Sequence, residues 1–397
     1  MHSSRQVHLL AALALMPAYA AMAQFGERPK PAFELPRPRE RSPALPREIA
    51  ETWWTIRADG TASRLDAPAM PSGDAGLLAA WIDPLPSPSR RESKAPTLAL
   101  ADGQRIVGEV GDADGAVAWI SPWCAPRALG GTLDGILSIS FDGSEPPAAT
   151  EQDIVVLRNG DRIDGIVESI GPKMLSIDRS GSPESGSVSV ALESVASISL
   201  VSPPVAPGGA RVWLRDGSVL DGPTLHWMGS DYLQLPGVAG AKTTTLSLPR
   251  RMVVALQWTP GTIVPLASLR PAMAAPAGTG GSRVGQPTAS SSGRWPLELA
   301  PVEVEGPVVL AYQGMTRRSA LRAVVTRDAT TRAAGSPELI VRQSGKESFR
   351  RTLGASDLKV ELDVPLEPGG FEIELSRKDG QLAGTFAVLE RAMLVPR

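Results

Sequence analysis

The stretch Leu-Ala-Asp-Gly-Gln-Arg-Ile-Val-Gly, residues 100–108, returns twice in similar form. The second copy is Leu-Arg-Asn-Gly-Asp-Arg-Ile-Asp-Gly at 157–165, and the third is Leu-Arg-Asp-Gly-Ser-Val-Leu-Asp-Gly at 214–222, a step of 57 residues each time. Asp-Gly and Asn-Gly between apolar residues predict a hairpin, because these pairs supply the positive φ angles of tight primed turns. The constant spacing indicates a duplicated β-module.

Short strand patterns surround each copy of this phrase. In the second copy they fall at residues 153–157, 162–168, 173–177, 188–190 and 195–200. Four or five short strands in one repeat fit a small barrel or roll of SH3-like size, and three units are too few to close a propeller. We therefore expect three tandem modules of this kind, at residues 95–145, 152–202 and 209–258.

The amino terminus has the pattern of a secretory leader. Arg5 precedes a short apolar run at residues 9–16, and Ala21-Met22-Ala23 matches a small-x-small cleavage site. We expect a signal peptide over residues 1–23, with an uncleaved anchor as the alternative. No other stretch approaches ~18 apolar residues, so no transmembrane span is expected after cleavage. The predicted location is secreted, periplasmic or in the cell envelope.

The remaining segments are divided by composition. A Pro-rich linker is expected at 24–50, an irregular segment at 51–94, and a flexible Ala/Pro/Gly/Ser-rich linker at 259–294. Within 51–94, residues 51–60 read as a strand and 76–82 as a short helix or a strand. Residues 295–397 contain seven or eight strand patterns, which predict an antiparallel jelly roll or β-sandwich. The predicted fold class is therefore all-β.

Composition excludes some functions. The 397 residues carry a net charge of −2, so no basic field attracts nucleic acid, and the one Cys permits no intramolecular disulfide. Of three His, two lie in the leader, which leaves His226. One His and one Cys do not supply a zinc site, and no Asp-x-Asp-x-Asp-Gly calcium loop is present. We expect no metal and no cofactor.

Catalytic residues are poorly represented as well. A nucleophilic triad would depend on His226 alone, which we interpret as a surface or half-buried histidine. Cys124 lies among Trp and Pro residues and is interpreted as a buried, inert thiol. A glycosidase needs two converging carboxylates, whereas the obvious acids all lie in or beside the repeat turns, where Asp is favoured for local hydrogen bonds: Asp102, Asp161, Asp164, Asp216 and Asp221. We predict no catalytic residues.

The register of the repeat strands singles out the third copy. Because strand residues alternate between faces, Val212 and Leu214 are expected to face the core, which places Trp213 on the outer face between Arg211 and Arg215. An outward Trp between two Arg has the composition of a sugar-stacking platform. The alternative is that Trp213 packs against a neighbouring module. We take Trp213, Arg211, Arg215, Trp227 and His226 as the candidate ligand-binding residues.

The carboxy-terminal quarter of the chain resembles a known family. The resemblance rests on residues 307–312 (Pro-Val-Val-Leu-Ala-Tyr), 317–325, 336–349, 360–366, 372–375 and 386–395, taken in that order. These segments resemble the NPCBM/NEW2 domain, a jelly-roll carbohydrate-binding module associated with family 98 glycosyl hydrolases. The family's early Gly-Leu-Gly-x-His segment has no counterpart here. The resemblance implies a jelly roll that binds polysaccharide.

The sequence thus predicts a secreted, non-catalytic protein whose carboxy-terminal domain binds carbohydrate, with a polysaccharide or envelope glycan as partner. The first alternative is a structural or protein-interaction scaffold of the cell envelope, whose partners are other envelope proteins. The second alternative is a glycoside hydrolase. Nucleic acid is not an expected partner.

Overall fold

The structure, a computed structural model, describes the chain from Thr52 to its carboxy-terminal Arg397 with several gaps. The described ranges are 52–66, 76–86, 94–112, 115–121, 129–130, 132–149, 151–179, 186–228, 232–236, 245–274, 283–285, 295–327, 336–354, 356–357, 359–376 and 386–397. They form antiparallel β-sheets connected by turns and single 3₁₀ turns, which confirms the all-β class. The predicted signal peptide, the Pro-rich linker and Cys124 lie outside the described residues.

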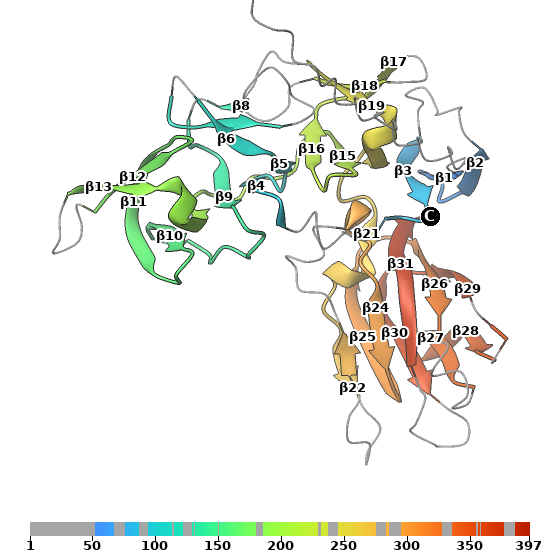
Figure 1. Ribbon diagram of the computed structural model, residues 1–397. Coiled ribbons are helices and arrows are strands. Elements are labelled where there is room, and N and C mark those ends of the chain that lie inside the picture. The colour runs from blue at the N-terminus through green and yellow to red at the C-terminus, as the bar shows by residue number, and fades with distance from the viewer. Residues whose placement is uncertain are drawn as a thin grey trace, which may run out of the picture. The chain divides into compact units, whose positions relative to one another are not determined.

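The second repeat shows the plan of the module most clearly (Figure 1). Its strands pair in the order β13-β12-β11-β10-β14, so the last strand returns to pair with the first. A 3₁₀ turn, η2 (Leu192–Ser194), separates β13 from β14. The bounds are β10 (Asp153–Leu157), β11 (Arg162–Ile170), β12 (Met174–Asp178), β13 (Ser187–Ala191) and β14 (Val195–Ser199). This is the small barrel or roll that the strand pattern predicts.

The same closure occurs in the other two repeats. In the first, β4 (Thr97–Leu100) pairs with β9 (Ile136–Ser140), and in the third, β15 (Ala210–Leu214) pairs with β20 (Val253–Gln257). The strands between them are β5 (Arg105–Val107), β6 (Glu109–Gly111), β7 (Ala118–Ile120), β8 (Leu129–Gly130), β16 (Val219–Gly222), β17 (His226–Met228), β18 (Tyr232–Pro236) and β19 (Thr245–Pro249). The third repeat also has a 3₁₀ turn, η3 (Arg250–Met252), before its last strand.

The turn of the repeated phrase differs from the predicted primed turn. Gly103, Gly160 and Gly217 have φ angles of 85°, 92° and 88°, but the Asp or Asn before each is not in the positive-φ region. A type I′ turn needs positive φ at both positions, whereas a three-residue loop with one αL glycine needs it only at the glycine. The Asp or Asn instead accepts the amide of the residue two positions on, as Asp102 Oδ1 does from Gln104 at 3.0 Å.

The last glycine of the phrase is fixed by close packing. A Cβ on Gly108 would lie 2.2 Å from the carbonyl oxygen of Ile120, and one on Gly165 would lie 2.5 Å from that of Asp178. No side chain fits such an approach of two backbones. The recurrence of this glycine therefore reflects the crossing of neighbouring strands inside each module.

Strand pairing also joins the repeats to one another. One sheet runs in the order β13-β12-β11-β10-β14-β9-β4-β5-β16-β15-β20-β3-β1-β2. Its last three strands come from the segment expected to be irregular: β1 (Thr52–Arg57), β2 (Ala62–Asp66) and β3 (Leu77–Asp83). The expected strand at 51–60 is present, and of the two interpretations of 76–82 the strand is correct. The domain boundaries remain predictions.

The carboxy-terminal residues form two antiparallel sheets, seen in orange and red in Figure 1. One sheet has the order β23-β24-β31-β26-β29, with β21 also pairing with β31, and the other has the order β22-β25-β30-β27-β28. The bounds are β24 (Val302–Glu305), β25 (Val308–Met315), β26 (Ser319–Thr326), β27 (Glu338–Gln343), β28 (Lys346–Thr352), β29 (Lys359–Leu366), β30 (Gly369–Ser376) and β31 (Phe386–Pro396). Buried residues of both sheets form a single core cluster, which confirms the β-sandwich.

Part of the expected flexible linker belongs to this sandwich. Three short strands lie within 259–294: β21 (Val264–Pro265), β22 (Ala272–Ala274) and β23 (Arg283–Gly285). They pair with β31, β25 and β24 respectively. Backbone pairing at a sheet edge does not need an apolar side-chain pattern, so the Ala/Pro/Gly-rich composition gave no sign of these strands.

The strand β31 contributes to two cores. Ala387, Leu389 and Leu394 belong to the core of the sandwich, whereas Met393 and Val395 belong to the core cluster that contains the buried residues of the repeats. Because successive side chains of a strand point to opposite faces, β31 packs one face into the sandwich core and part of its other face against the repeat strands.

Candidate functional site

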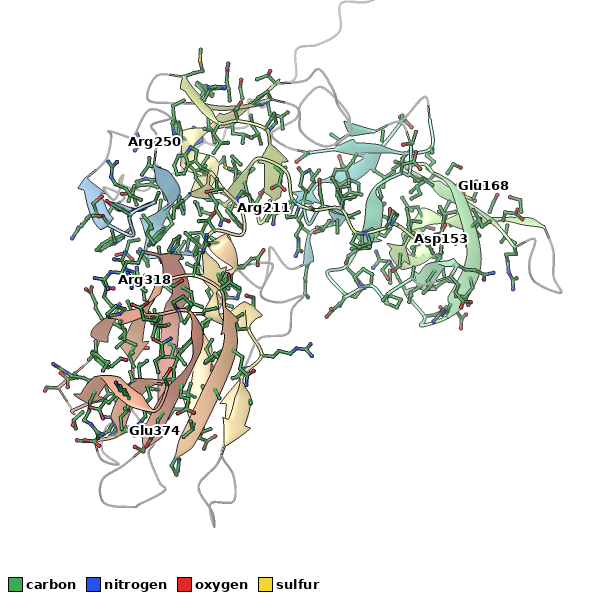
Figure 2. All side chains as sticks on the ribbon, turned by 180° about the vertical axis from the view of Figure 1, so that it is seen from behind. Asp153, Glu168, Arg211, Arg250, Arg318 and Glu374 are labelled. Atoms are coloured by element: carbon green, nitrogen blue, oxygen red, sulfur yellow. The ribbon has the colours of Figure 1, made fainter. Side chains whose placement is uncertain are left out.

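Arg211, a predicted ligand-binding residue, is buried in an ion pair on the repeat strands (Figure 2). Its Nε and Nη2 donate to the two carboxylate oxygens of Asp221 at 2.7 and 2.8 Å, and Nη2 also donates to the Asp102 carbonyl at 2.9 Å. Burial raises the pKa of Asp221, and the hydrogen bonds from Arg211 oppose this rise. The Gln104 Oε1 accepts the Asp221 amide at 2.9 Å, so the pair links the first and third repeats.

Trp213 is 3% exposed and belongs to the repeat core. Every residue of its strand β15 is buried, although alternate residues face opposite sides of the sheet. The 3₁₀ turn η5 (Pro296–Glu298) packs on the paired strand β20, and Glu298 lies 3.6 Å from Arg211. Burial thus favours the packing alternative for Trp213 over an exposed stacking platform.

The other three predicted residues make separate contacts of their own. Arg215 Nε donates to the Arg251 carbonyl at 2.6 Å, and the Nε2 of the exposed His226 lies 3.0 Å from the Thr224 hydroxyl. Trp227 is half-buried against the repeat core. The structure therefore does not bring the five residues together in one site, and their role in ligand binding stays a prediction.

The turn aspartates have local partners, as the sequence indicates. Asp216 Oδ1 accepts the Ser218 amide at 2.9 Å, Asp164 pairs with Arg162, and Asp161 accepts from Asn159. Within the described part of the chain, no group of three or more His, Cys, Asp or Glu side chains has the arrangement of a metal site. No helix among the same residues is both long and apolar enough to span a bilayer.

A cavity that combines aromatic and charged side chains lies on the outer face of the sheet that contains β26 and β29. Its volume is about 480 Å³, within the range of small-molecule sites. Leu362 and its alternate neighbours on β29 face the sandwich core, so Glu361 and Asp363 face outward. Arg322 lies opposite Asp363 on β26, and Trp54 and Trp81 complete the lining from β1 and β3.

Arg322 carries hydrogen-bonding capacity that the described residues do not use. Its Nη2 donates to Asp363 Oδ2 at 3.1 Å, but its Nε and Nη1 are buried and have no hydrogen-bond partner among the described residues. A buried donor without a partner costs roughly 1–3 kcal/mol, and more when it is charged. A ligand oxygen could accept from these nitrogens only after the Arg322 side chain moved, because neither nitrogen is accessible to solvent.

The two tryptophans are held in place by strand pairing and by one ion pair. Trp54 and Trp81 are directly opposite each other on paired strands, so they share a face of the sheet. Trp54 is half-buried and its Nε1 donates to Asp83 Oδ2 at 3.2 Å, while Arg391 Nη1 donates to Asp83 Oδ1 at 2.8 Å. Arg391 has a φ of 52° beside a register shift in β31, a bulge that redirects its side chain.

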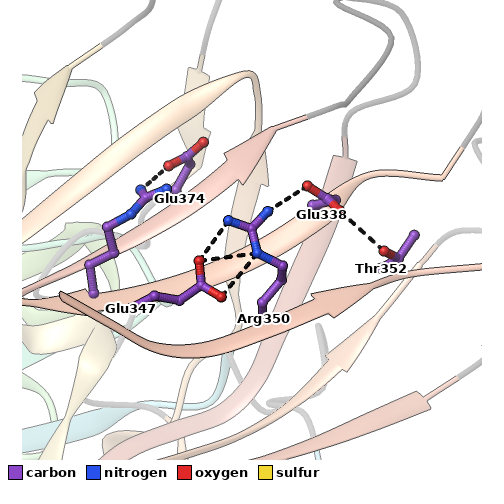
Figure 3. A network of polar contacts seen from close by, with 6 residues as sticks. Glu338, Glu347, Arg350, Thr352 and Glu374 are labelled. Atoms are coloured by element: carbon purple, nitrogen blue, oxygen red, sulfur yellow. Dashed lines mark hydrogen bonds and ion pairs between the residues drawn. The ribbon is translucent and has the colours of Figure 1, made fainter.

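The outer face of the other sheet carries charges that satisfy one another (Figure 3). Arg350 lies between Glu347, at 2.6 Å from Nη2, and Glu338, at 2.8 Å from Nη1. Arg342 pairs with Glu374 on the neighbouring strand. These side chains have their partners within the sheet and leave less capacity for a ligand than Arg322 does.

Comparisons with known proteins gave matches among solved structures only; no family model and no curated protein matches the chain. It is similar to a CBM51 module from Clostridium perfringens GH95 in complex with methyl-galactose: 13% identity, 34% of this chain, 100% of that chain, TM-score 0.27. It is also similar to the tandem CBM51 modules of Sp3GH98, a family 98 glycoside hydrolase from Streptococcus pneumoniae: 10% identity, 87% and 88% coverage, TM-score 0.27. A third match contains CBM51-2 with GlcNAc and INT domains from Clostridium perfringens ZmpB: 9% identity, 47% and 43% coverage, TM-score 0.28.

Proposed function

We propose that this chain is a non-catalytic carbohydrate-binding protein and that its sugar site is the cavity between Arg322, Trp54 and Trp81. The observation that carries the proposal is the guanidinium of Arg322, which has two buried nitrogens without a partner among the described residues, beside the half-buried indole of Trp54. Sugars present hydroxyl oxygens that accept such hydrogen bonds, and their apolar ring faces stack on indole rings.

The carboxylates of the cavity complement this donor. Glu361 and Asp363 accept hydrogen bonds only, so sugar hydroxyls can donate to them while accepting from Arg322. The resemblance of residues 307–395 to the NPCBM/NEW2 domain supports the same ligand class. The leader-like residues 1–23 support action outside the cytoplasm, in the secreted or envelope fraction, with a polysaccharide or envelope glycan as partner.

A glycan array probed with the full chain tests this proposal, together with two Trp variants. Trp54→Ala is expected to lose binding to every glycan that the unchanged chain retains. Trp258→Ala is the matched control, because Trp258 is also half-buried but lies outside both the cavity lining and the predicted set of ligand-binding residues, and it is expected to bind normally. Absence of binding to any glycan, or equal loss in both variants, would contradict the proposal. Release of soluble sugar would instead favour the glycoside hydrolase alternative.

A second candidate function is a structural scaffold of the cell envelope. The observation that favours it is the continuous sheet through all three repeats, reinforced by the buried contacts of Arg211 with Asp221 and Asp102. Such a sheet holds the modules in a fixed register, as a spacer requires. Capture of envelope proteins by a chain that binds no glycan would favour this function.

A further inference from the structure

A second cavity adjoins the first on the same outer sheet face. Its volume is about 320 Å³, and its lining includes Trp295, Leu85 and Val388 together with the charged side chains of Lys359 and Glu390. Trp295 is half-buried, with part of its indole packed on the sandwich core. The second cavity thus resembles the first, because in both a tryptophan lies beside groups that donate and accept hydrogen bonds.

The two cavities are neighbours along one strand. Lys359 lines the second cavity and Glu361 lines the first, and both belong to the exposed, outward-facing positions of β29. Residues two apart on a strand are about 7 Å apart. Arg391 lines both cavities, so they meet at its side chain.

The boundary between the cavities is a fixed ion pair. Asp83 accepts Arg391 Nη1 on one carboxylate oxygen at 2.8 Å and the Trp54 indole on the other at 3.2 Å. The positive φ of Arg391 is unfavourable for a side-chain-bearing residue and is maintained by the surrounding contacts. The Asp83–Arg391 ion pair therefore lies at the boundary between the two cavities. A ligand that extends from one cavity into the other would pass this ion pair and contact its polar groups.

We propose that the two cavities are subsites for consecutive units of one neutral oligosaccharide, with Arg391 and Asp83 contacting the chain where it passes between them. This inference rests on the proposed sugar-binding function and extends it to the size and charge of the ligand. A single sugar unit fills one cavity, whereas a chain of two or more units gains the contacts of Trp295 and Lys359 as well.

Charge balance argues for a neutral ligand. The cavities contain three cations, Arg322, Arg391 and Lys359, against four anions: Asp83, Glu361, Asp363 and Glu390. The sum of −1 gives no attraction for sulfated or uronate-rich chains, which sites rich in Arg and Lys select. The alternation of donors and acceptors instead matches uncharged hydroxyl groups.

Titration calorimetry on the full chain tests the inference. The neutral ligands are four series of one to four units: the cello-, xylo-, manno- and β-1,4-galacto-oligosaccharides. Heparin is the anionic probe. For at least one neutral series, we expect the Kd to fall at least tenfold between one and two units, and heparin to bind more weakly. Trp295→Ala should remove that gain and leave the affinity for the single sugar unchanged.

Lys359→Ala provides a second variant, because its exposed side chain is removed at little risk to folding, and it should reduce the gain as well. Lys346→Ala, exposed on β28 of the other sheet, is the matched control and should change nothing. Three outcomes would overturn the inference while leaving sugar binding intact. They are equal affinity for single sugars and oligosaccharides, equal loss of both affinities in Trp295→Ala, and tighter binding of heparin than of the neutral sugars. No binding in any series, together with none on the glycan array, would overturn the proposed function itself.

Discussion

Two regions of the molecule combine arginine with tryptophan, and they use the arginine in opposite ways. Between the repeats, Arg211 beside Trp213 is buried and bonds to Asp221, to the Asp102 carbonyl and, at longer range, to Glu298. On the sandwich, Arg322 bonds to Asp363 through one nitrogen, and its other two have no partner in the described part of the chain. In the first region the arginine and the tryptophan come from one strand, whereas in the second they come from strands far apart in the sequence.

The difference separates a structural arginine from a ligand-binding one. A guanidinium that is hydrogen-bonded to protein groups holds the elements of those groups together, so its removal lowers the free energy of unfolding. A guanidinium with buried unused donors beside a half-buried indole has hydrogen-bonding capacity left for a ligand. The exposed pair formed by Arg350 and Glu347 gives a third setting, in which a satisfied arginine contributes little to either property.

The largest expected effect is on stability, at Arg211. Arg211→Met leaves the Asp221 carboxylate buried without its partner, so we expect a loss of about 3–5 kcal/mol in the free energy of unfolding. Chemical denaturation measures this loss. Arg215→Met, four residues further along the chain and just past the end of β15, changes a more exposed side chain and should lose less than about 1 kcal/mol.

A double variant sharpens the same point. Arg211→Met combined with Asp221→Leu removes both charges, so it should recover a large part of the stability that the single variant loses. If Arg211→Met unfolds at the same denaturant concentration as the unchanged chain, Arg211 is not the structural contact that its geometry indicates.

The second effect is on binding, at Arg322. Arg322→Met removes charge-assisted hydrogen bonds worth about 1.5–3 kcal/mol, so the Kd for the best glycan on the array should rise at least about tenfold. The unfolding free energy should change by less than about 1 kcal/mol, because two of the removed nitrogens have no partner among the described residues and the third pairs with a mostly exposed carboxylate.

Arg350→Met is the matched control for binding, since Arg350 belongs to the satisfied network on the opposite sheet. It should bind glycan as the unchanged chain does. Equal affinities in the two variants would remove the distinction between the two sheet faces.

A smaller effect is expected at Asp363, which orients Arg322. The carboxylate is mostly exposed, so Asp363→Ala should cost no more than about 1 kcal/mol of stability and roughly a two- to fivefold loss of glycan affinity. Glu367→Ala breaks the comparably exposed pair with Arg318, away from the cavity, and serves as the control. The prediction is wrong if Glu367→Ala lowers the glycan affinity as much as Asp363→Ala does.

Local chemistry made most of the fold predictable. The recurring Asp-Gly or Asn-Gly pair and the alternation of apolar residues identified the repeat strands and most strands of the sandwich. The strand β28 was missed because nearly all of its side chains are exposed and polar, as an edge strand permits. The turn type was wrong because the Asp side chain, by bonding to the amide two residues on, favours a type I turn over a primed one.

The site was less predictable because its parts are distant in sequence. Register placed Trp213 on the outer face, but the sequence did not reveal that the 296–298 turn packs on the neighbouring strand β20. The cavity joins Trp54 of β1 to Arg322 of β26, and their proximity follows from tertiary packing alone. An alternation of charged and apolar residues at 359–366 was the only local sign that this sheet has a polar outer face.

The smallest expected effect concerns the satisfied network and depends on pH. Hydrogen bonds from Arg350 lower the pKa of Glu347 from its usual value of 4.5. A lowered pKa in the folded state means that ionised Glu347 stabilises the fold above about pH 4.5, and that this contribution disappears as the pH falls through the lowered value. A side-chain NMR titration should therefore show Glu347 titrating below pH 4.5, and Arg350→Gln should return its pKa toward that value.

Arg351→Gln is the control for this titration. Arg351 is at the next position of β28 and pairs with Asp357, so its replacement should leave the Glu347 titration unchanged. An unshifted Glu347 in the unchanged chain would show that the network of Figure 3 is not formed in solution, and the contrast between the two sheet faces would then depend on Arg322 alone.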